Sequence, residues 1–337
     1  MKAVAYQIPG TIDREDSLQD ITLDTPVPTG HDLLVEVRAV SVNPVDTKVR
    51  SKAAAEDGGW KILGWDAAGI VSAVGDQVTG FKPGDEVWYA GSILRQGTNS
   101  EFHLVDERIV GRKPTSASFA EAAALPLTSL TAWEMLFDRL RVTAPVPGAD
   151  NAVLIIGGAG GVGSIAIQLL REKTDLTVIA TASRPETVAW VKELGAHHVI
   201  DHHKPFGEQL KALGLGAPAF VFSTNATQYH AEQIADVIAP QGRFGLIDDP
   251  ESVAIGLFKS KSVSIHWELM YTRSIFQTPD MDEQGKILNE VSGLIDAKKI
   301  RTTLTDVMGP INAATLRKAH GLIESNTARG KIVLEGF

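Results

Sequence analysis

Apolar and polar positions alternate with two different rhythms along the chain. Residues 1 to about 125 carry short apolar or alternating runs, among them 33–40 and 68–75, broken by glycine and proline. This pattern predicts the short strands of an all-β barrel. From about residue 127, short apolar runs alternate with amphipathic segments of helical length, which predicts a parallel sheet with right-handed crossovers. The tail ends this alternation with two expected helices, near 284–296 and 311–323, and a strand at 331–334.

These rhythms predict a discontinuous two-domain α/β fold. Residues 127–262 are expected to form a doubly wound, dinucleotide-binding Rossmann domain. Residues 1–126 and 263–337 are expected to form the β-barrel domain together, because the tail should return to it. A chain of 337 residues is long enough to give each domain its own core.

A glycine-rich stretch between a strand and a helix carries the clearest chemical signal. Gly158, Gly160 and Gly163 follow a short apolar run and open an apolar-periodic helix, with Gly161 and Val162 between them. In this context the G-x-G-x-x-G pattern indicates dinucleotide binding. The first glycine permits a tight turn, the second lets the backbone approach a pyrophosphate, and the third lets the helix pack against the strand. A plain glycine-rich turn is the less favoured alternative.

The end of the next expected strand indicates which cofactor binds. NAD enzymes place an acidic residue on the adenosine ribose about 20 residues after the glycines. Here Ser183 and Arg184 stand near that position, and no Asp or Glu does. A hydroxyl and a guanidinium suit a 2′-phosphate, which a carboxylate would repel, so NADP(H) is favoured over NAD(H). The alternative is that these two residues only cap the next helix, with Pro185 in its first turn; Ser183 can do both.

Composition excludes several classes of function. The formal net charge of −9 favours neither nucleic acid nor an anionic membrane as a partner. The sequence contains no cysteine, so disulfides, thiolate zinc sites and a cysteine nucleophile are excluded. The N-terminus lacks the apolar core of a signal peptide, and no apolar run is long enough to span a membrane. The expected location is the cytoplasm.

Five motifs carry a resemblance that covers nearly the whole chain. They lie at 41–46, 75–87, 126–133, 276–281 and 330–334. With them the chain resembles the medium-chain dehydrogenase/reductase superfamily, most of all its quinone oxidoreductase branch and the bacterial members often labelled zinc-type alcohol dehydrogenase-like. The resemblance implies a GroES-like catalytic domain interrupted by a Rossmann domain. It also implies a homodimer joined through the edges of the Rossmann sheets.

The zinc ion of related dehydrogenases is expected to be lost in this chain. By the resemblance, zinc-dependent relatives have a cysteine at the position of Asn43 and Gly-His-Glu at the position of Gly64-Trp65-Asp66. A catalytic zinc needs three protein ligands, usually nitrogen or sulfur, and only Asp66 is left. We therefore expect Trp65 to fill the metal space. Alcohol oxidation is disfavoured, because no metal would help to deprotonate the alcohol.

The nine histidines are not expected to bind a metal. His197-His198 and His202-His203 flank an expected strand, and neighbours along a strand point to opposite faces. By the resemblance, His202 takes the place of a tyrosine near the adenosine phosphate. A surface or cofactor-side role is therefore favoured. Asp248 to Glu251 follow the last sheet strand and are expected in a solvated loop.

Hydride transfer without a metal suits an activated acceptor. A quinone or an α,β-unsaturated carbonyl takes hydride with little electrophilic help, and donors near its carbonyl stabilise the developing oxyanion. Asn43 is a candidate donor or, equally, a turn residue before Pro44. Tyr271 is the candidate general acid, although no spacing fixes that role.

Other candidates surround the expected reacting groups. By the resemblance, Thr128 contacts the nicotinamide ribose; its alternative role is a helix N-cap, and both can hold. Asn225 follows a sheet strand at the ligand-binding edge and is a weaker candidate on the nicotinamide side. The aromatic and flexible apolar residues of the expected substrate pocket would be interdomain core under the alternative interpretation. They are Trp65, Trp267, Met270 and Phe276.

Three hypotheses for the function follow. The leading one is a zinc-independent, NADPH-dependent reductase of small-molecule quinones or enones. The second is an NADPH-binding structural or regulatory protein without turnover. The third, which is disfavoured, is a zinc-dependent alcohol dehydrogenase.

Overall fold

The chain folds into two compact units. The structure is a computed structural model that describes residues 1–337, apart from the side chain of Asp57. The first unit comprises Met1–Leu130 and Tyr271–Phe337, and the second comprises Thr131–Met270. The second unit is therefore inserted in the sequence of the first, which confirms the predicted discontinuous α/β architecture.

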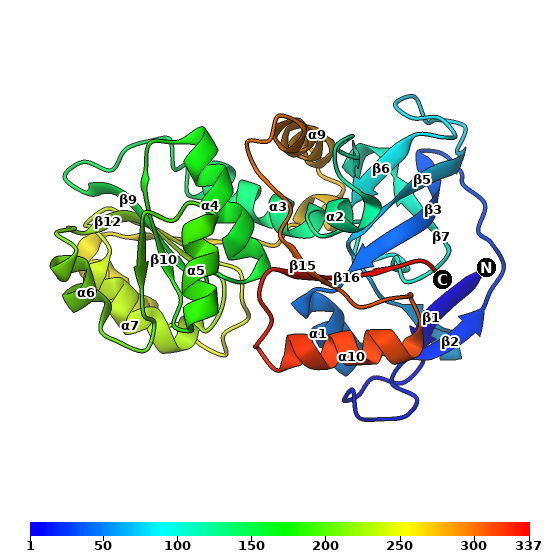
Figure 1. Cartoon of the computed structure of the whole chain (residues 1–337), viewed down its shortest axis with the longest axis horizontal. Helices are drawn as coiled ribbons and strands as arrows, with labels where there is room; N and C mark the ends of the chain where they lie inside the picture. Colours follow the sequence, from blue (N-terminus) through cyan, green and yellow to red (C-terminus); the bar gives the residue numbers. More distant parts are fainter. The chain divides into compact units, whose positions relative to one another are not determined.

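The first unit is built on two sheets. Its strands are β1 (Lys2–Tyr6), β2 (Gln19–Thr22), β3 (Asp32–Ser41), β4 (Lys61–Ile62), β5 (Ala67–Val74), β6 (Glu86–Tyr89), β7 (Phe102–Asp106), β8 (Val110–Arg112), β15 (Leu304–Val307) and β16 (Lys331–Glu335). A three-stranded sheet has the order β2-β1-β4, and a seven-stranded sheet has the order β15-β16-β3-β5-β6-β8, with β7 also paired to β3. The long strand β3 lies beside β5 and β7 (Figure 1). The strand β16 from the tail pairs antiparallel with β3, so the tail does return to this unit.

Helices of the first unit lie between and after these strands. They are α1 (Pro44–Lys52), η1 (Glu56–Gly58), η2 (Glu107–Ile109), α2 (Phe119–Ala123), α8 (Thr272–Phe276), α9 (Glu283–Asp296) and α10 (Ala313–Glu324), with α3 (Pro126–Trp133) at the start of the inserted segment. The sequence pattern predicted α9 and α10 but not α1, α8 or β15. The helix α1 was not predicted, because its many polar side chains leave little helical periodicity in the apolar positions. Its start is nevertheless encoded, since Pro44 occupies the first turn and Asn43 precedes it.

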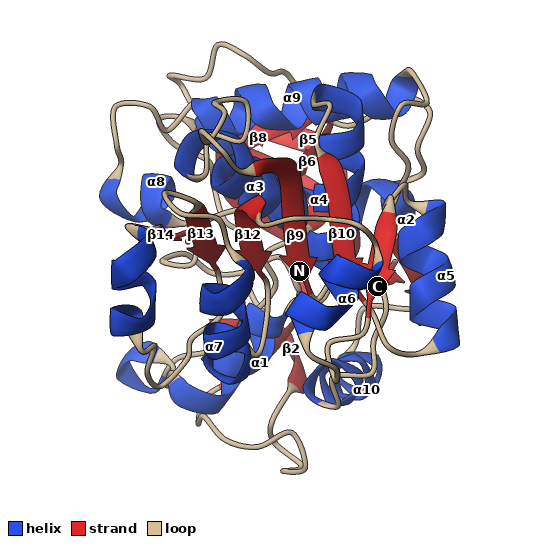
Figure 2. Cartoon of the chain, turned by 90° about the vertical axis from the view of Figure 1, so that its left-hand side faces the viewer, coloured by secondary structure: helices blue, strands red, loops and turns tan.

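The second unit is a parallel sheet with helical crossovers. Its elements are η3 (Glu134–Arg139), β9 (Asp150–Ile156), α4 (Gly161–Lys173), β10 (Thr177–Thr181), α5 (Pro185–Glu193), β11 (His198–Ile200), α6 (Phe206–Ala212), β12 (Pro218–Ser223), α7 (Thr227–Val237), β13 (Arg243–Leu246), η4 (Ile255–Lys261) and β14 (Ser264–Trp267). The strand order is β11-β10-β9-β12-β13-β14, and all pairs are parallel. Figure 2 shows β13, β12, β9 and β10 side by side. The order reverses between β9 and β12, and such a switch point is where open α/β sheets bind ligands.

Two boundaries of this unit differ from the sequence pattern. The strand β14 joins the sheet beside β13, so the unit extends past Ser262 to Met270. The helix expected from Thr128 to Leu140 begins earlier and divides into α3 and the wider-wound η3. Periodicity alone does not reveal such a change of helical winding, because the apolar spacing stays similar.

Both central strands of the second unit are deeply buried. The side chains of Leu154, Ile156 and Val221 form one apolar cluster with residues from the crossing helices. This packing fixes the carboxyl ends of the strands, where the glycine-rich turn begins. Among the described residues, no helix has the length and apolar character needed to cross a membrane.

Candidate active site

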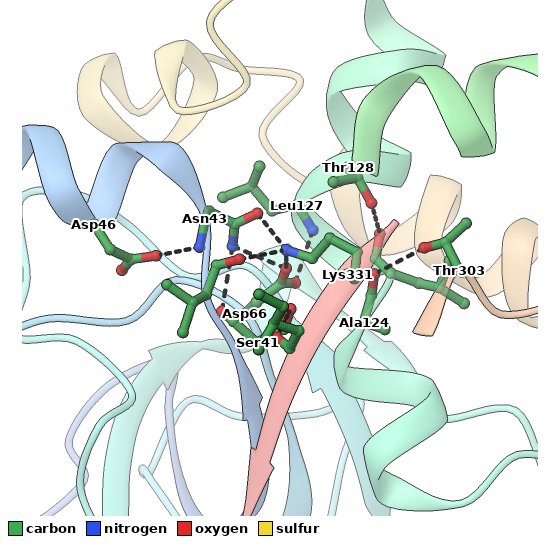
Figure 3. Close-up of polar contacts among 12 residues, drawn as sticks. Ser41, Asn43, Asp46, Asp66, Ala124, Leu127, Thr128, Thr303 and Lys331 are labelled. Carbon is green, nitrogen blue, oxygen red and sulfur yellow. Dashed lines mark hydrogen bonds and ion pairs between the residues drawn. The ribbon is translucent and has the colours of Figure 1, made fainter. Parts of the chain in front are cut away.

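Asp66 lies at the centre of a buried polar network in the first unit (Figure 3). It immediately precedes β5 and is fully buried. The backbone N–H of Leu127 donates to its Oδ1 at 3.0 Å. The side chains of Asn43 and Lys331 donate to its Oδ2 at 3.0 and 3.1 Å. Burial raises the pKa of Asp66, and the ammonium group of Lys331 acts in the opposite direction.

Lys331 brings a positive charge into this network. Its ammonium group donates to the backbone oxygen of Val42 at 3.0 Å and to Oδ1 of Asn43, besides Asp66. Three donor protons thus meet three acceptors, which is what a buried ammonium requires. Lys331 was not among the site residues predicted from the sequence. The available signal was a lysine at the start of an otherwise apolar strand, because such a charge is buried only with partners.

The amide of Asn43 is held at both ends by this network. Its Nδ2 donates to Asp66 at 3.0 Å and lies 3.4 Å from the backbone oxygen of Ser41, while its Oδ1 accepts from Lys331. The residue is 1% exposed. Its position just before α1 agrees with the turn interpretation, and its amide protons face protein acceptors rather than a ligand.

Asp46 is a second buried carboxylate beside this network. Its Oδ2 accepts from the backbone N–H of Asn43 at 2.6 Å, and its Oδ1 accepts from that of Gly64 at 3.0 Å. Burial raises the pKa of Asp46 to about 7, against the effect of these two donors. Gly64 is required at its position, because its φ is +103° and a Cβ would lie 2.6 Å from the hydroxyl of Thr98.

Tyr271 offers a buried hydroxyl near these carboxylates. Its ring meets the ring of Trp65 edge-on, with centroids 6.3 Å apart. The hydroxyl has no hydrogen-bond partner among the described residues, although Tyr271 is only 2% exposed. Burial raises its pKa well above the ordinary value, and the negative charges of Asp46 and Asp66 add to this effect. The group therefore stays protonated and can donate.

The residues at the expected metal position do not fit a catalytic zinc ion. Trp65 is buried, and its indole N–H donates to the backbone oxygen of Ser92 at 3.2 Å, so it offers no lone pair. Asn43 and Asp66 already hold the ammonium of Lys331. In the described part of the chain, no group of three or more His, Asp or Glu side chains is arranged to hold a metal ion.

Thr128 lies inside the first turn of α3. The helix begins at Pro126, and the Thr128 hydroxyl donates back to the oxygen of Leu125 at 3.1 Å. The N-cap alternative is therefore wrong, since the N-cap precedes the first helical residue. Thr128 is 2% exposed. A contact with a nicotinamide ribose stays a prediction.

The glycine-rich turn of the second unit fits a dinucleotide. It joins the end of β9 to α4, which begins at Gly161. A Cβ on Gly163 would lie 2.4 Å from the oxygen of Gly157, and one on Gly158 would lie 2.8 Å from the Cβ of Ala180. Gly160 has only one neighbour, at 3.5 Å, so the turn is open there. The first N–H groups of α4 have no acceptor within the helix and suit a pyrophosphate.

Ser183 and Arg184 stand beside this turn at the end of β10. Thr181, the last residue of β10, accepts from the N–H of Gly157 at 3.0 Å and so ties the strand to the turn. Oγ of Ser183 lies 3.4 Å from Nε2 of His202. Arg184 is the residue before α5 and makes an exposed ion pair with Glu186 at 3.2 Å. The side chain of Arg184 does not cap the helix.

Asn225 and Asp248 lie at the neighbouring strand ends. Asn225 is exposed, and a Cβ on Gly157 would lie 2.6 Å from its Oδ1, so its amide borders the glycine-rich turn. Asp248 is not merely part of a solvated loop. Its carboxylate accepts from the N–H and the hydroxyl of Thr227, at 2.9 and 2.5 Å, and so holds the start of α7.

The remaining predicted pocket residues fall in different places. Trp267 and Met270 belong to the second unit, where Trp267 is 55% exposed and Met270 is buried. Phe276 ends α8 in the first unit and is 74% exposed. Within the first unit, the rings of Trp65 and Tyr271 meet edge-on.

Comparison with known proteins covers both units. Residues 29–134 match the family model of the alcohol dehydrogenase GroES-like domain, and residues 161–283 match that of the zinc-binding dehydrogenase. The chain is 36% identical over 336 residues to a zinc-type alcohol dehydrogenase-like protein of Staphylococcus epidermidis, with 99% of each chain covered.

Solved structures extend this likeness. The crystal structure of a "putative zinc-dependent alcohol dehydrogenase protein" from Rhizobium etli is 67% identical, with a TM-score of 0.99 and 100% and 98% of the two chains covered. The Escherichia coli quinone oxidoreductase complexed with NADPH is 25% identical, with a TM-score of 0.82 and 99% and 100% covered.

Proposed function

Because the chain belongs to the medium-chain dehydrogenase/reductase superfamily of oxidoreductases, we propose that it transfers hydride from NADPH to a quinone or an α,β-unsaturated carbonyl compound without a catalytic zinc ion. The similarity to a quinone oxidoreductase complexed with NADPH supports this choice. The second unit supplies the dinucleotide turn, and the first supplies the polar groups of the reaction.

One observation carries the proposal: the ammonium of Lys331 bonds both Asn43 and Asp66, the residues that stand at two of the expected zinc-ligand positions. It forms an ion pair with Asp66 at 3.1 Å, and its three protons are donated to Val42, Asn43 and Asp66, so none is left for a further acceptor. A divalent ion there would have to displace this buried charge. An acceptor that needs little electrophilic help is therefore the suitable substrate.

Tyr271 is the proton donor of the proposed reaction. When bound, NADPH supplies the hydride that the acceptor carbon takes up. The hydroxyl of Tyr271 gives the accompanying proton to the acceptor, and solvent returns that proton to the phenolate oxygen. The acceptor thus gains one hydride and one proton in total. The buried, unpartnered hydroxyl is available for this step.

Asn43 acts as a positioning residue in this scheme. Its amide links Lys331 to Asp66 and fixes the start of α1. The carboxylate of Asp66 in turn holds the N–H of Leu127, next to Thr128. A change at Asn43 is therefore expected to act through the shape of the site rather than through a lost substrate contact.

The proposed cofactor preference depends on Ser183 and Arg184. A guanidinium at 42% side-chain exposure can turn toward a phosphate on the ribose. Asn225 and the turn residues Gly158, Gly160, Gly161, Val162 and Gly163 would hold the rest of the dinucleotide. These residues favour NADP(H) over NAD(H).

The proposed enzyme is a homodimer joined through β14. This strand is one of the two outer strands of its sheet. Its last residue, Trp267, is 55% exposed, and Leu269, two residues further on, is 53% exposed. An outer strand with exposed apolar side chains is a surface that pairs with another chain. Light scattering during size-exclusion chromatography, with Trp267→Lys as the variant, tests this part.

Turnover with a panel of acceptors tests the proposed reaction. NADPH oxidation is measured with quinones, enones and simple ketones, before and after treatment with a zinc chelator. The expected result is turnover of quinones or enones that the chelator leaves unchanged. NADPH binding without any turnover would support a binding protein instead. Alcohol oxidation that is lost with chelation and restored by zinc would establish a zinc dehydrogenase.

A further inference from the structure

Three histidines lie together at the carboxyl edge of the second sheet. His202 and His203 follow β11, and His230 comes from α7. The ring centroid of His202 lies 4.3 Å from that of His203 and 6.3 Å from that of His230. The ring of Phe206 packs against that of His230, with ring centroids 5.5 Å apart. We call these three residues the histidine cluster.

The histidine cluster borders Ser183 and Arg184, the residues expected to contact the adenosine ribose and its 2′-phosphate. Nε2 of His202 lies 3.4 Å from the hydroxyl of Ser183. Ser183 follows β10, whose last residue, Thr181, is bonded to the glycine-rich turn. Nδ1 of His230 is buried and has no hydrogen-bond partner among the residues that the structure describes. The cluster therefore holds imidazole nitrogens that a ligand can use.

The charged groups around the cluster come from three segments. Asp201 and Lys204 share the turn after β11 and face each other at 3.7 Å. Arg184 and Glu186 lie at the start of α5. Asp248 follows β13 and acts on His230. The carboxylate of Asp201 accepts from the N–H of His203, and that of Asp248 accepts from Thr227, so the acids are already engaged.

Burial and the neighbouring rings favour the neutral form of His202 and of His230 in the absence of an anion. Partial burial lowers the pKa of His202, and the neighbouring His203 lowers it further, while Asp201 opposes them. Burial also lowers the pKa of His230, followed by His202 and His203, against Asp248. A negative charge placed among the rings would raise these pKa values.

We propose that the histidine cluster forms a proton-dependent site for the 2′-phosphate of NADPH, so that the preference for NADPH over NADH increases as the pH falls. The inference rests on the proposed NADP(H) preference and adds the regulation of that same site. Arg184 keeps its charge at every relevant pH and supplies the constant part of the preference. The cluster supplies the part that changes near neutrality.

The direction follows from proton linkage. Without an anion the neutral form of His202 and His230 is favoured, and phosphate binding draws a proton onto these two rings. Binding therefore takes up protons and becomes tighter as the pH falls, by at most about tenfold per pH unit for each proton. NADH lacks the 2′-phosphate and does not share this dependence.

Binding measurements at two pH values test the proposal without turnover. Calorimetry would give the Kd of NADPH, NADH and 2′,5′-ADP at about pH 8 and about pH 6.5, above the second phosphate pKa of about 6. The Kd of NADPH and of 2′,5′-ADP is expected to fall about 3- to 10-fold at the lower pH. The Kd of NADH is expected to change less than about twofold. Calorimetry in buffers of different ionisation enthalpy should show proton uptake with 2′,5′-ADP.

Paired variants assign the effect to the cluster. The double variant His202→Gln/His230→Gln should lose the pH dependence and keep the preference at about pH 8. His266→Gln is the control, because His266 lies in β14 at the opposite edge of the same sheet. Its burial likewise lowers its pKa. This control variant should behave like the unaltered protein.

The outcomes separate this proposal from the proposed function. A preference for NADPH that stays equal at both pH values overturns the histidine cluster and leaves the proposed function intact. A preference that is absent at both pH values overturns both. Should the double variant fold poorly, NMR titration of the histidine ring protons in the unaltered protein decides. An upward pKa shift of cluster resonances with 2′,5′-ADP supports the proposal, and unchanged values overturn it.

Discussion

The candidate sites of the two units differ in how deeply their charged side chains are buried and in how completely they are paired. In the first unit, Lys331 and Asp66 are buried and every donor proton of the ammonium has a protein acceptor. In the second unit, the ion pair of Arg184 with Glu186 is exposed to solvent, with 42% and 54% of the two side chains accessible. Charges that are fully paired hold a structure in place, whereas loosely held ones can exchange partners with a ligand. The first unit therefore uses charge to shape a site, whereas we propose that the second unit uses it to bind the cofactor.

Loss of the buried cation should have the largest effect. Lys331→Met leaves Asp66 buried without its partner and is expected to lower the free energy of unfolding by about 3–5 kcal/mol. Urea unfolding followed by circular dichroism measures this change. Combining it with Asp66→Asn should recover part of the loss, and Lys52→Met on the exposed end of α1 should change little. Equal stability of Lys331→Met and the unaltered protein would contradict the paired-charge interpretation.

Removal of the Tyr271 hydroxyl should act on the reaction and not on the cofactor. Tyr271→Phe is expected to lower kcat about 100-fold, the typical contribution of a positioned proton donor, with the Kd of NADPH unchanged. Because burial raises the pKa of Tyr271 well above 10, kcat should show no fall below about pH 10 that depends on this residue. Tyr229→Phe is the matched control, since Tyr229 is 82% exposed. A full kcat in Tyr271→Phe would remove it from the mechanism.

Two glycines of the same turn should respond differently to one added methyl group. In Gly163→Ala the Cβ would meet the oxygen of Gly157 at 2.4 Å, so we expect a loss of about 1–3 kcal/mol of stability and weaker NADPH binding. In Gly160→Ala the nearest atom lies at 3.5 Å, an ordinary contact. Thermal unfolding and calorimetry on both variants test the difference. If both tolerate the methyl group equally, close helix packing is not the reason for Gly163.

Removal of the Arg184 charge should give the smallest effect, a change of about tenfold in the Kd of NADPH. Arg184→Ala is expected to raise the Kd of NADPH about 10-fold and to leave that of NADH unchanged, because a charge-assisted hydrogen bond is lost. Lys192→Ala on the exposed side of α5 is the control. Fluorescence titration of both cofactors measures the ratio. An equal rise for NADH and NADPH would mean that Arg184 does not read the phosphate.

Much of the fold could be predicted because patterns among neighbouring residues determine most of its helices, strands and turns. The glycine-rich turn is encoded within a few residues, and the structure places β9, the turn and α4 as expected. The place of β14 was missed, because a run of four residues, of which two are exposed, is a weak signal for a sheet strand. Membership of β14 in the second sheet depends on pairing with β13, which no local pattern shows.

The candidate site was harder to predict because its parts are far apart in the sequence. Asn43 and Trp65 were found through the resemblance, but the partner Lys331 lies 265 residues beyond Asp66. Burial also decides what Asn43 can do, and the sequence could not show that its amide is already engaged. The histidine spacing predicted no metal site, yet it did not show that His230 joins His202 and His203 from another helix.

The separation of Lys331 from Asp66 has a consequence for how the chain is made. A ribosome adds about 5–20 residues per second, so it incorporates Lys331 tens of seconds after it has incorporated Asp66. During that interval the whole inserted segment, Thr131–Met270, is synthesised and can fold. The unit that comes first in the sequence is therefore the last to be completed. The carboxylate of Asp66 stays hydrated until β16, which carries Lys331, has been synthesised.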